Sequence, residues 1–378
     1  MRWSYAWAIS AGLAAGCAGA LPQSAPPAPA PAERAELPAN EAASPAAAEA
    51  PLTAAATVDV SIAAVGDIML GTDYPQNILP DDDGVGFLGA VTPALAAADI
   101  AFGNLEGTLL DGGEPVKQCK SPTACYVFRT PARYARYLQE AGFDVMSLAN
   151  NHAADFGEAG RESTMQALDA AGIRHSGREG DVASWAVKGR RVALVAFAPN
   201  VGAHQLNDLA AARARVAQLA AAHDIVIVSF HGGAEGDGAE ILPFARERFH
   251  GEDRGDVVEF SRGMIDAGAD LVLGHGPHVV RPLELYQDRL IAYSLGNFAT
   301  YYGISVADAR GLAPILIARL ADDGAFLGGR IESTIQVRPD GPQPDPERRA
   351  LSMMRELTDR AFPTGELVIT DDGQLARR

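Results

Sequence analysis

The sequence predicts an α/β fold whose sheet strands are buried on both faces. From about residue 58 onward, short apolar or β-branched runs alternate with longer segments of helical period. The predicted strands are Val58–Val65, Asp99–Gly103, Asp144–Ala149, Arg191–Ala198, Asp224–Phe230, Asp270–Gly274 and Arg289–Ser294. The predicted helices are Pro131–Ala141, Glu158–Ala171, Asp208–His223 and Asp256–Ala267, and Gly142, Gly172 and Gly268 are typical residues after a helix. This alternation is typical of α/β domains.

The repeating pattern divides the chain into a main α/β domain, residues 58–320, and a C-terminal extension, residues 321–378. In the extension we expect a turn-rich connector at Pro339–Pro346, an amphipathic helix at Glu347–Ala361 and a short strand at Glu366–Ile369. Because the extension shows no separate catalytic motif, we expect it to pack on the main domain.

The first 17 residues have the order of a secretory signal peptide. Arg2 precedes the apolar run Trp3–Leu13, and small residues lead to Cys17. The run is shorter than the ~20 residues of a membrane-spanning helix. Residues 13–17 resemble a bacterial lipobox, which predicts lipidation at Cys17; the alternative is a cleaved signal in which Cys17 is incidental. We therefore expect export across the inner membrane, to the periplasm or to a membrane-anchored state.

Residues 18–57 consist largely of Ala, Pro, Glu and Ser. A segment of this composition does not bury enough apolar surface to offset its ordering entropy, so it predicts a disordered tether. A tether directly after a lipidated cysteine would hold a domain away from a membrane surface.

Charge and cysteine content narrow the range of functions. The net charge of −17 argues against a nucleic-acid partner, because phosphates would be repelled.

Cys119 and Cys125 flank a proline turn, a spacing that suits a local disulfide in an oxidising compartment. A zinc pair is the alternative, but no other Cys and no nearby His completes a four-ligand site.

Six predicted strands end in a small polar cluster. The clusters are Gly66-Asp67, Gly103-Asn104-Leu105-Glu106, Asn150-Asn151-His152, His231-Gly232-Gly233, Gly274-His275-Gly276-Pro277-His278 and Ser294-Leu295-Gly296-Asn297. In open α/β sheets, ligands bind outside the carboxyl ends of the strands. We therefore expect these side chains to share one functional site.

The residue types at these strand ends suit metal binding and proton transfer. Asp, Glu, Asn and His supply the oxygen and imidazole ligands of zinc or manganese, and also move protons near neutral pH. Taken singly, each has a simpler explanation: Asn104 or Asn297 would hold a turn, and Asp155 would cap the following helix. Glu106 and Glu235 are expected as ligands, bases or anchoring groups. The pattern as a whole favours a site, because four of the eight histidines fall just after strand ends.

Together, these motifs resemble the CapA family of poly-γ-glutamate capsule synthesis proteins. The matching segments run in the family's order over roughly residues 60–300: Gly66-Asp67, Asn104-Leu105-Glu106, Asn150-Asn151-His152 with Asp155 and Gly157, His231-Gly232, Gly274-His275 with Pro277-His278-Val279, and Tyr293 to Phe298. The ordered set is far more specific than any one motif.

The resemblance implies a layered α-β-β-α sandwich similar to calcineurin-like metallophosphoesterases, with a divalent metal such as zinc, manganese or iron. The implied ligands are Asp67, Asn151, His231, His275 and His278, with His152 as the proton donor. Three departures put a second metal position and phosphate-ester cleavage in doubt. Met69 stands where those enzymes have a His, the last two histidines are one residue further apart, and the Asn104/Glu106 pair replaces an Asp.

Three functions follow from the resemblance. The first is synthesis, export or anchoring of poly-γ-glutamate or a related anionic capsular polymer, with a metal-assisted site for amide or peptide chemistry, His152 and Glu106 as catalytic groups, and capsule-synthesis proteins as partners. Arg246, Arg248 or Arg281 would then hold substrate carboxylates. The second is a metal-dependent phosphoesterase. The third is a non-catalytic envelope binding or scaffold protein.

Overall fold

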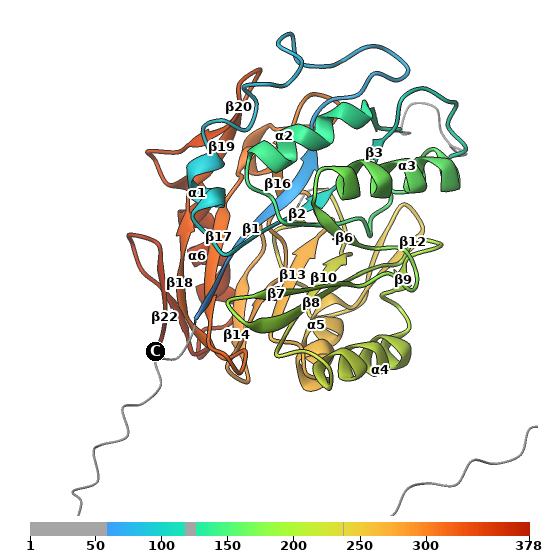
Figure 1. Ribbon diagram of the computed structural model, residues 1–378. Coiled ribbons are helices and arrows are strands. Elements are labelled where there is room, and N and C mark those ends of the chain that lie inside the picture. Colours follow the sequence, from blue (N-terminus) through green and yellow to red (C-terminus); the bar gives the residue numbers. More distant parts are fainter. Residues whose placement is uncertain (1–58, 118–125, 237) are drawn as a thin grey trace, which may run out of the picture. The chain divides into compact units, whose positions relative to one another are not determined.

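The computed structural model describes residues 59–117, 126–236 and 238–378. The predicted signal peptide, the tether, Cys17, Cys119 and Cys125 lie outside the described residues. Within the described part, six α-helices and two main sheets are present (Figure 1). The α-helices are α1 Thr92–Ala96, α2 Ala135–Glu140, α3 Gly157–Ala170, α4 Leu209–Ala220, α5 Val257–Asp266 and α6 Arg349–Ala361; two 3₁₀ turns are η2 Ala132–Tyr134 and η3 Asp308–Gly311.

The first sheet has nine strands among the described residues, in the order β21-β22-β18-β17-β1-β2-β5-β6, with β16 also paired to β1. The strands β1, β2, β5, β6 and β16 run parallel, and the others are antiparallel. Their bounds are β1 Val60–Met69, β2 Ile100–Leu105, β5 Val145–Ser147, β6 Arg174–Ser176, β16 Asn297–Thr300, β17 Ile315–Leu320, β18 Phe326–Glu332, β21 Leu367–Ile369 and β22 Gln374–Arg377.

The second sheet has seven strands in the described part, in the order β14-β15-β13-β10-β8-β7, with β9 paired to β8. Its central strands β8, β10, β13 and β15 are parallel. The bounds are β7 Ala183–Val187, β8 Arg190–Ala198, β9 His204–Gln205, β10 Ile225–His231, β13 Leu271–His275, β14 Leu283–Tyr286 and β15 Arg289–Ala292. Three small pairs complete the set: β3 Thr108–Leu109 with β4 Arg129–Thr130, β11 Glu247–Phe249 with β12 Glu252–Gly255, and β19 Thr334–Val337 with β20 Gly341–Pro344.

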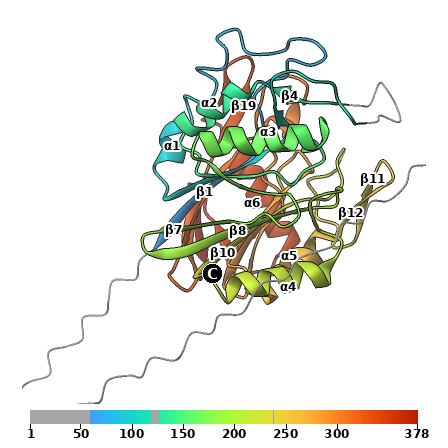
Figure 2. The ribbon, with the colours of Figure 1, turned by 45° about the vertical axis from the view of Figure 1, so that its right-hand side comes forward.

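Alternate residues of each central strand enter different cores, which builds the predicted α-β-β-α layers. Ile62 and Ala64 of β1 join Leu194 of β8 in the core between the sheets. Their neighbours Ala63 and Val65 pack on the other face, with side chains of α1, α2 and α3. The outer face of the second sheet is covered by α4 and α5 (Figures 1 and 2). Each central strand is therefore buried on both faces, as its continuous apolar sequence predicts, and the layered fold class is confirmed.

The C-terminal residues continue the first sheet and cover one side of the core between the sheets. Strands β18, β21 and β22 extend the nine-stranded sheet beyond β17. Helix α6 places Ala350, Leu351 and Met354 in the core between the sheets. The expected connector at Pro339–Pro346 was wrong in part, because it contains β20, which pairs with β19. A two-stranded pair tolerates the prolines of β20, since not every backbone N–H is needed for pairing.

Candidate metal centre

The carboxyl ends of the two sheets meet at one cluster of ionisable side chains. Asp67 at the end of β1 pairs in register with Asn104 of β2, and His231 at the end of β10 lies opposite His275 of β13. Two contacts join the sheets: His275 Nδ1 lies 3.4 Å from Asp67 Oδ1, and His231 Nε2 lies 3.3 Å from Glu106 Oε1. The first sheet thus supplies carboxylates and the second supplies imidazoles. We call Asp67, Glu106, His231, His275 and His278 the metal-site group.

A close backbone approach fixes Asp67 in this position. A Cβ atom on Gly66 would lie 2.0 Å from the carbonyl oxygen of Gly296, so only glycine fits there. The backbone N–H of Asp67 donates to that same carbonyl at 2.9 Å. The approach also sets Asn297 opposite Asp67 in the pairing of β16 with β1. The Asn297 amide donates to the carbonyls of Ser305 and Arg310, which orients its Oδ1 toward the cluster.

His278 lies on a tight loop and contacts residues of the cluster through its Nδ1 atom. Its Nδ1 lies 3.0 Å from both Asp67 Oδ2 and Asn297 Oδ1, and 3.7 Å from Glu106 Oε2. Its backbone φ is +59°, a conformation that few non-glycine residues adopt and that is frequent at functional sites. The loop is therefore shaped as predicted from Gly276-Pro277, and the two histidines contact different oxygens of Asp67.

Burial and mutual charge shift the pKa values of the group. Burial raises the pKa of the Asp67 carboxyl, but the nearby ring nitrogens and positive charge of His275 and His278 outweigh it and hold that pKa well below its usual range. The pKa of Glu106 is also lowered, because attraction to His278 and His231 exceeds burial and repulsion from Asp67. Burial lowers the pKa of His231 despite Glu106. For His278, the nearby carboxylates Glu106, Asp67 and Glu235 overcome burial and raise the pKa to about 10.

The unpaired polar atoms of the group fit a bound cation. Both carboxylate oxygens of Glu106 and both ring nitrogens of His231 and His275 are buried without a hydrogen-bond partner. Each such atom costs about 1–3 kcal/mol, and buried polar atoms in native proteins are nearly always satisfied. In addition, Asp67, Glu106 and His278 each offer a ligand atom within 4.8 Å of the others. Imidazole and carboxylate ligands suit zinc, manganese or iron, so these residues fit a divalent metal.

A second group of side chains lies beside the first on the loop after β5. His152 Nδ1 lies 2.7 Å from Asp155 Oδ2, and Lys117 Nζ lies 2.8 Å from Asp155 Oδ1. Because an ionised carboxylate only accepts, the contact with Asp155 places the hydrogen on Nδ1, which also lies 3.3 Å from Lys117 Nζ, and Nε2 is the ring nitrogen that Asp155 does not hold. The ring of His152 lies 4.3 Å from that of Phe128, centroid to centroid. We call His152, Asp155 and Lys117 the proton-transfer group.

The sequence suggested that Asp155 caps helix α3, but in the structure it does not. The N-cap residue is Phe156, which makes no side-chain cap hydrogen bond. Asp155 instead accepts from the backbone N–H of Phe128 at 2.9 Å and binds His152 and Lys117. Burial raises the pKa of Asp155, but the charges and hydrogen bonds of His152 and Lys117 lower it overall. Lys117 was missed because it stands in a loop with no motif around it.

Asn150 connects the two groups. Its Nδ2 donates to Asn104 Oδ1 at 3.2 Å and to the carbonyl of Leu105, and its Oδ1 accepts from the backbone N–H of His152. Asn104 in turn donates to Asp67 at 2.8 Å. Asn151, one of the five ligands that the resemblance implies, is half-buried with its Oδ1 unpaired. The Asn150-Asn151 pair in the sequence indicated a functional asparagine after β5, but it did not indicate which of the two amides contacts the neighbouring strand.

The charged residues around the site are largely paired with each other. Glu235 Oε2 lies 3.8 Å from His278 Nε2, and its other oxygen lies 3.3 Å from the fully buried Arg254. Arg281, a predicted carboxylate-binding residue, is instead buried and bound by both outer nitrogens to Glu247. Arg246 pairs with Asp253, whereas Arg248 is exposed. The expectation for Arg281 was therefore wrong, because its guanidinium already has a carboxylate.

A family comparison covers the part of the chain that contains this site. Residues 61–302 match the model of the bacterial capsule synthesis protein family, PGA_cap. The chain belongs to this family. The matched region begins in β1 and ends after β16, so it contains the metal-site group and the proton-transfer group. The resemblance to CapA proteins inferred from the motifs is confirmed.

Curated relatives cover the same part of the chain. The PGA biosynthesis protein CapA of Bacillus subtilis is 30% identical over 256 residues, which is 63% of each protein. The capsule biosynthesis protein CapA of Bacillus anthracis is 28% identical over 63% of this chain and 59% of its own length. A probable polyglutamine synthesis accessory protein of Mycobacterium tuberculosis is 31% identical over 54% of this chain and 57% of its own length. The chain thus matches about three fifths of these relatives.

Similar solved structures include a 5′-nucleotidase precursor from Thermus thermophilus, with a TM-score of 0.40 and 15% identity over 83% of this chain and 61% of that one. A purple acid phosphatase from yellow lupin has a TM-score of 0.37 and 9% identity over 74% and 52% of the two chains.

Among the described residues, none of the helices combines the length and apolar character needed to cross a bilayer.

Proposed function

We propose that this protein acts in the cell envelope on poly-γ-glutamate or a related anionic capsular polymer, in its synthesis, export or anchoring, through a metal-assisted site directed at amide bonds. The observation that carries the proposal is the set of unpaired, fully buried atoms on Glu106, His231 and His275. A cation bound among these atoms would give them the partners that they lack and would stabilise the folded chain. Membership of the capsule synthesis family supports the polymer as substrate.

The residues of the metal-site group would hold the metal, and the loop after β5 would handle protons. A bound divalent metal polarises a carbonyl or activates water. Asp67 is held ionised by its low pKa, so it remains a ligand across the physiological pH range. Asn104 orients Asp67 by donating to Oδ1. His152, held by Asp155 through Nδ1, presents Nε2 as the group that gives a proton to a departing amine or takes one from water.

The export predicted from residues 1–17 belongs to this proposal. A lipid on Cys17 would hold residues 59–378 near the membrane where a capsular polymer is made or released. Mass spectrometry of the membrane fraction tests this step. A diacylglyceryl-modified N-terminal Cys17 supports anchoring, whereas a released protein cleaved elsewhere contradicts it.

The function is tested with the purified protein loaded separately with zinc, manganese and iron. Poly-γ-glutamate, poly-α-glutamate and aryl phosphate mono- and diesters are the substrates, and new amines or released phenol are the readouts. We expect new amines from poly-γ-glutamate alone, and their loss in His152→Asn with metal content unchanged. Release of phenol alone would instead establish a phosphoesterase. If the polymer binds without reaction and His152→Asn retains function in cells, the protein is a non-catalytic binding subunit.

A further inference from the structure

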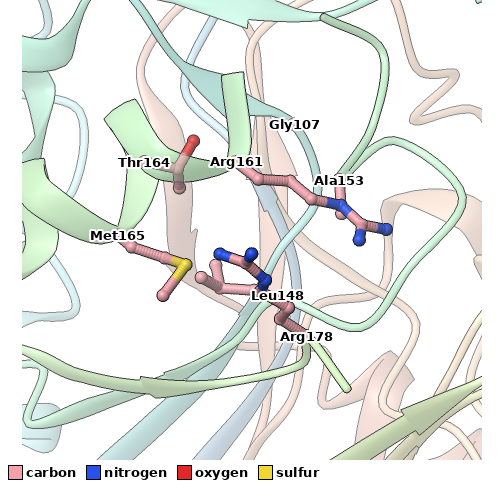
Figure 3. A pocket seen from close by; sticks show the side chains of 7 residues that line it. All are labelled: Gly107, Leu148, Ala153, Arg161, Thr164, Met165 and Arg178. Carbon is pink, nitrogen blue, oxygen red and sulfur yellow. The ribbon is translucent and has the colours of Figure 1, made fainter. Parts of the chain in front are cut away.

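A small pocket with two arginines lies against both groups of the site. It is lined by Gly107, Leu148, Ala153, Arg161, Thr164, Met165 and Arg178 (Figure 3). Gly107 directly follows Glu106, and Ala153 directly follows His152. The pocket therefore shares its wall with the backbone that carries one residue of each group.

The pocket also continues the edge of the sheet on which the site is built. Strands β1, β2, β5 and β6 are neighbours in parallel register, so their carboxyl ends form one edge. Asp67, Asn104 and Asn150 follow this edge in order, and Arg178 comes two residues after β6. With neighbouring strands about 4.8 Å apart, Arg178 lies roughly 14 Å along the edge from Asp67. An extended substrate on the metal-site group would pass the arginines next.

Arg161 brings a poorly compensated positive charge to this pocket. Its two outer nitrogens donate to the carbonyls of Gly202 and Val201, at 3.0 and 2.8 Å, and its Nε is buried without a partner. Within the described residues, no carboxylate lies within ion-pair distance of Arg161. Burial lowers the pKa of Arg161 and the charge of Arg178 lowers it further, against the opposing charges of Glu158 and Asp181. A guanidinium in this setting gains from an added anion.

Arg178 is the movable member of the pair. Its guanidinium lies 2.8 Å from Glu158, and the two side chains are 41% and 51% exposed. An ion pair this exposed contributes little to stability, so another carboxylate can replace Glu158. The space between the side chains is about 20 Å³, room for about one water molecule. A carboxylate would therefore enter by displacing Glu158 from Arg178.

We propose that Arg161 and Arg178 form a subsite for a free carboxylate of the polymer, one or more residues away from the amide bond at the metal-site group. The choice of polymer rests on the proposed function. Every residue of a γ-linked glutamate chain carries a free α-carboxylate, so such a chain offers an anion at each step along the sheet edge. Because the whole protein carries a net charge of −17, capture of a polyanion requires a local group of this kind.

Fluorescence anisotropy with a short fluorescein-labelled oligo-γ-glutamate tests the subsite, using the metal-loaded full chain. Arg178→Gln should weaken binding about tenfold, since it removes a charge-assisted contact. Glu158→Gln should strengthen binding about threefold, because Glu158 competes for Arg178; a purely structural ion pair would not give this gain. Arg191→Gln is the matched control, since Arg191 is an exposed arginine paired with Asp224. Arg161→Gln is a second variant, with its folding checked by circular dichroism.

The outcomes separate this proposal from the proposed function. Binding of the γ-linked oligomer that is unchanged in both Arg178→Gln and Glu158→Gln overturns the subsite and leaves the proposed function standing. Equal, Arg178-dependent binding of γ-linked and α-linked oligomers supports the subsite but contradicts a preference for the γ-linked polymer. No binding of either oligomer by the wild type overturns the subsite.

Discussion

The two groups at the carboxyl edge of the sheets are built in opposite ways. In the proton-transfer group, Asp155 Oδ2 accepts from the N–H of Phe128 and holds His152 through Nδ1, and Asp155 Oδ1, which has no hydrogen bond, lies 2.8 Å from the ammonium group of Lys117. In the metal-site group, Glu106, His231 and His275 keep buried polar atoms with no hydrogen bond. Asp155 and His152 are buried, as are Glu106, His231 and His275, so solvent access does not explain the difference between these residues.

This contrast shows which part of the site is complete in the polypeptide alone. Asp155 obtains its partners from the chain itself, and its ionised state is stabilised by Lys117 and His152. The metal-site group places two carboxylates and three imidazoles together and satisfies them only in part, through a positively charged His278. We infer that the first group is preorganised by folding, whereas the second is completed by a cation.

The largest expected effect is metal-dependent stability. A divalent metal that binds the folded state should stabilise it by about 4 kcal/mol at a free concentration 1,000 times the Kd. In the His231→Ala/His275→Ala variant this gain should disappear. Differential scanning calorimetry with and without zinc or manganese measures the effect. An equal rise in Tm for both proteins would place the metal elsewhere.

Removal of Asp155 should be the next largest effect, and it should not depend on metal. Asp155→Ala leaves Lys117, the Nδ1 of His152 and the N–H of Phe128 without their partner, which should cost about 3 kcal/mol of unfolding free energy. Asp169→Ala is the control, because Asp169 is 69% exposed and its carboxylate pairs with no residue but His175 in the described part of the chain, so it should change stability by less than about 0.5 kcal/mol. Urea unfolding measures the free energy of unfolding of both variants. Equal losses of stability would show that Asp155 contributes no more than an exposed aspartate.

The raised pKa of His278 predicts that the metal-free protein loses stability in alkali. The folded state keeps the His278 proton up to a pKa of about 10, whereas the unfolded state loses it near pH 6.5. The stabilising contribution is therefore complete below about pH 6.5 and is lost as pH rises toward 10. Between pH 7 and pH 9 the loss should be about 2.5 kcal/mol. Unfolding of metal-free wild type and His278→Asn at several pH values checks this, and parallel curves would contradict it.

The smallest expected effect is a gain in stability. His231→Phe removes two buried ring nitrogens that lack hydrogen bonds, so the metal-free protein should become about 1 kcal/mol more stable. The same change should abolish stabilisation by metal. If the metal-free variant is instead markedly less stable than the wild type, the 3.3 Å contact of His231 with Glu106 is a structural bond in its own right.

Local patterns in the sequence predicted strands buried on both faces and polar residues gathered at one sheet edge, whereas the α-β-β-α layers were implied by the resemblance to the CapA family. Continuous apolar runs give strands buried on both faces, and polar residues after parallel strands meet at one edge. The pairing of side chains could not be predicted in the same way. Whether Asn150 or Asn151 faces Asn104 depends on the turn after β5, and the partner of Arg281 depends on where Glu247 lies in the folded chain.

Lys117 shows the same limit more clearly. It belongs to a loop without periodicity, 38 residues before Asp155, and only the tertiary fold brings its ammonium group to that carboxylate.

Strands β18 and β22 were not predicted for a related reason. They alternate buried and exposed residues at one side of the sheet, so their apolar signal is weak and their role appears only through pairing.

The most direct test of the account is the metal content of the purified protein, measured by inductively coupled plasma mass spectrometry beside the His231→Ala/His275→Ala variant. The account predicts close to one or two equivalents of zinc, manganese or iron in the wild type and a loss of that metal in the variant, with His152→Ala retaining it. Wild-type protein that stays metal-free after reconstitution with each ion would contradict it, and would leave the unpaired atoms of Glu106, His231 and His275 without an explanation.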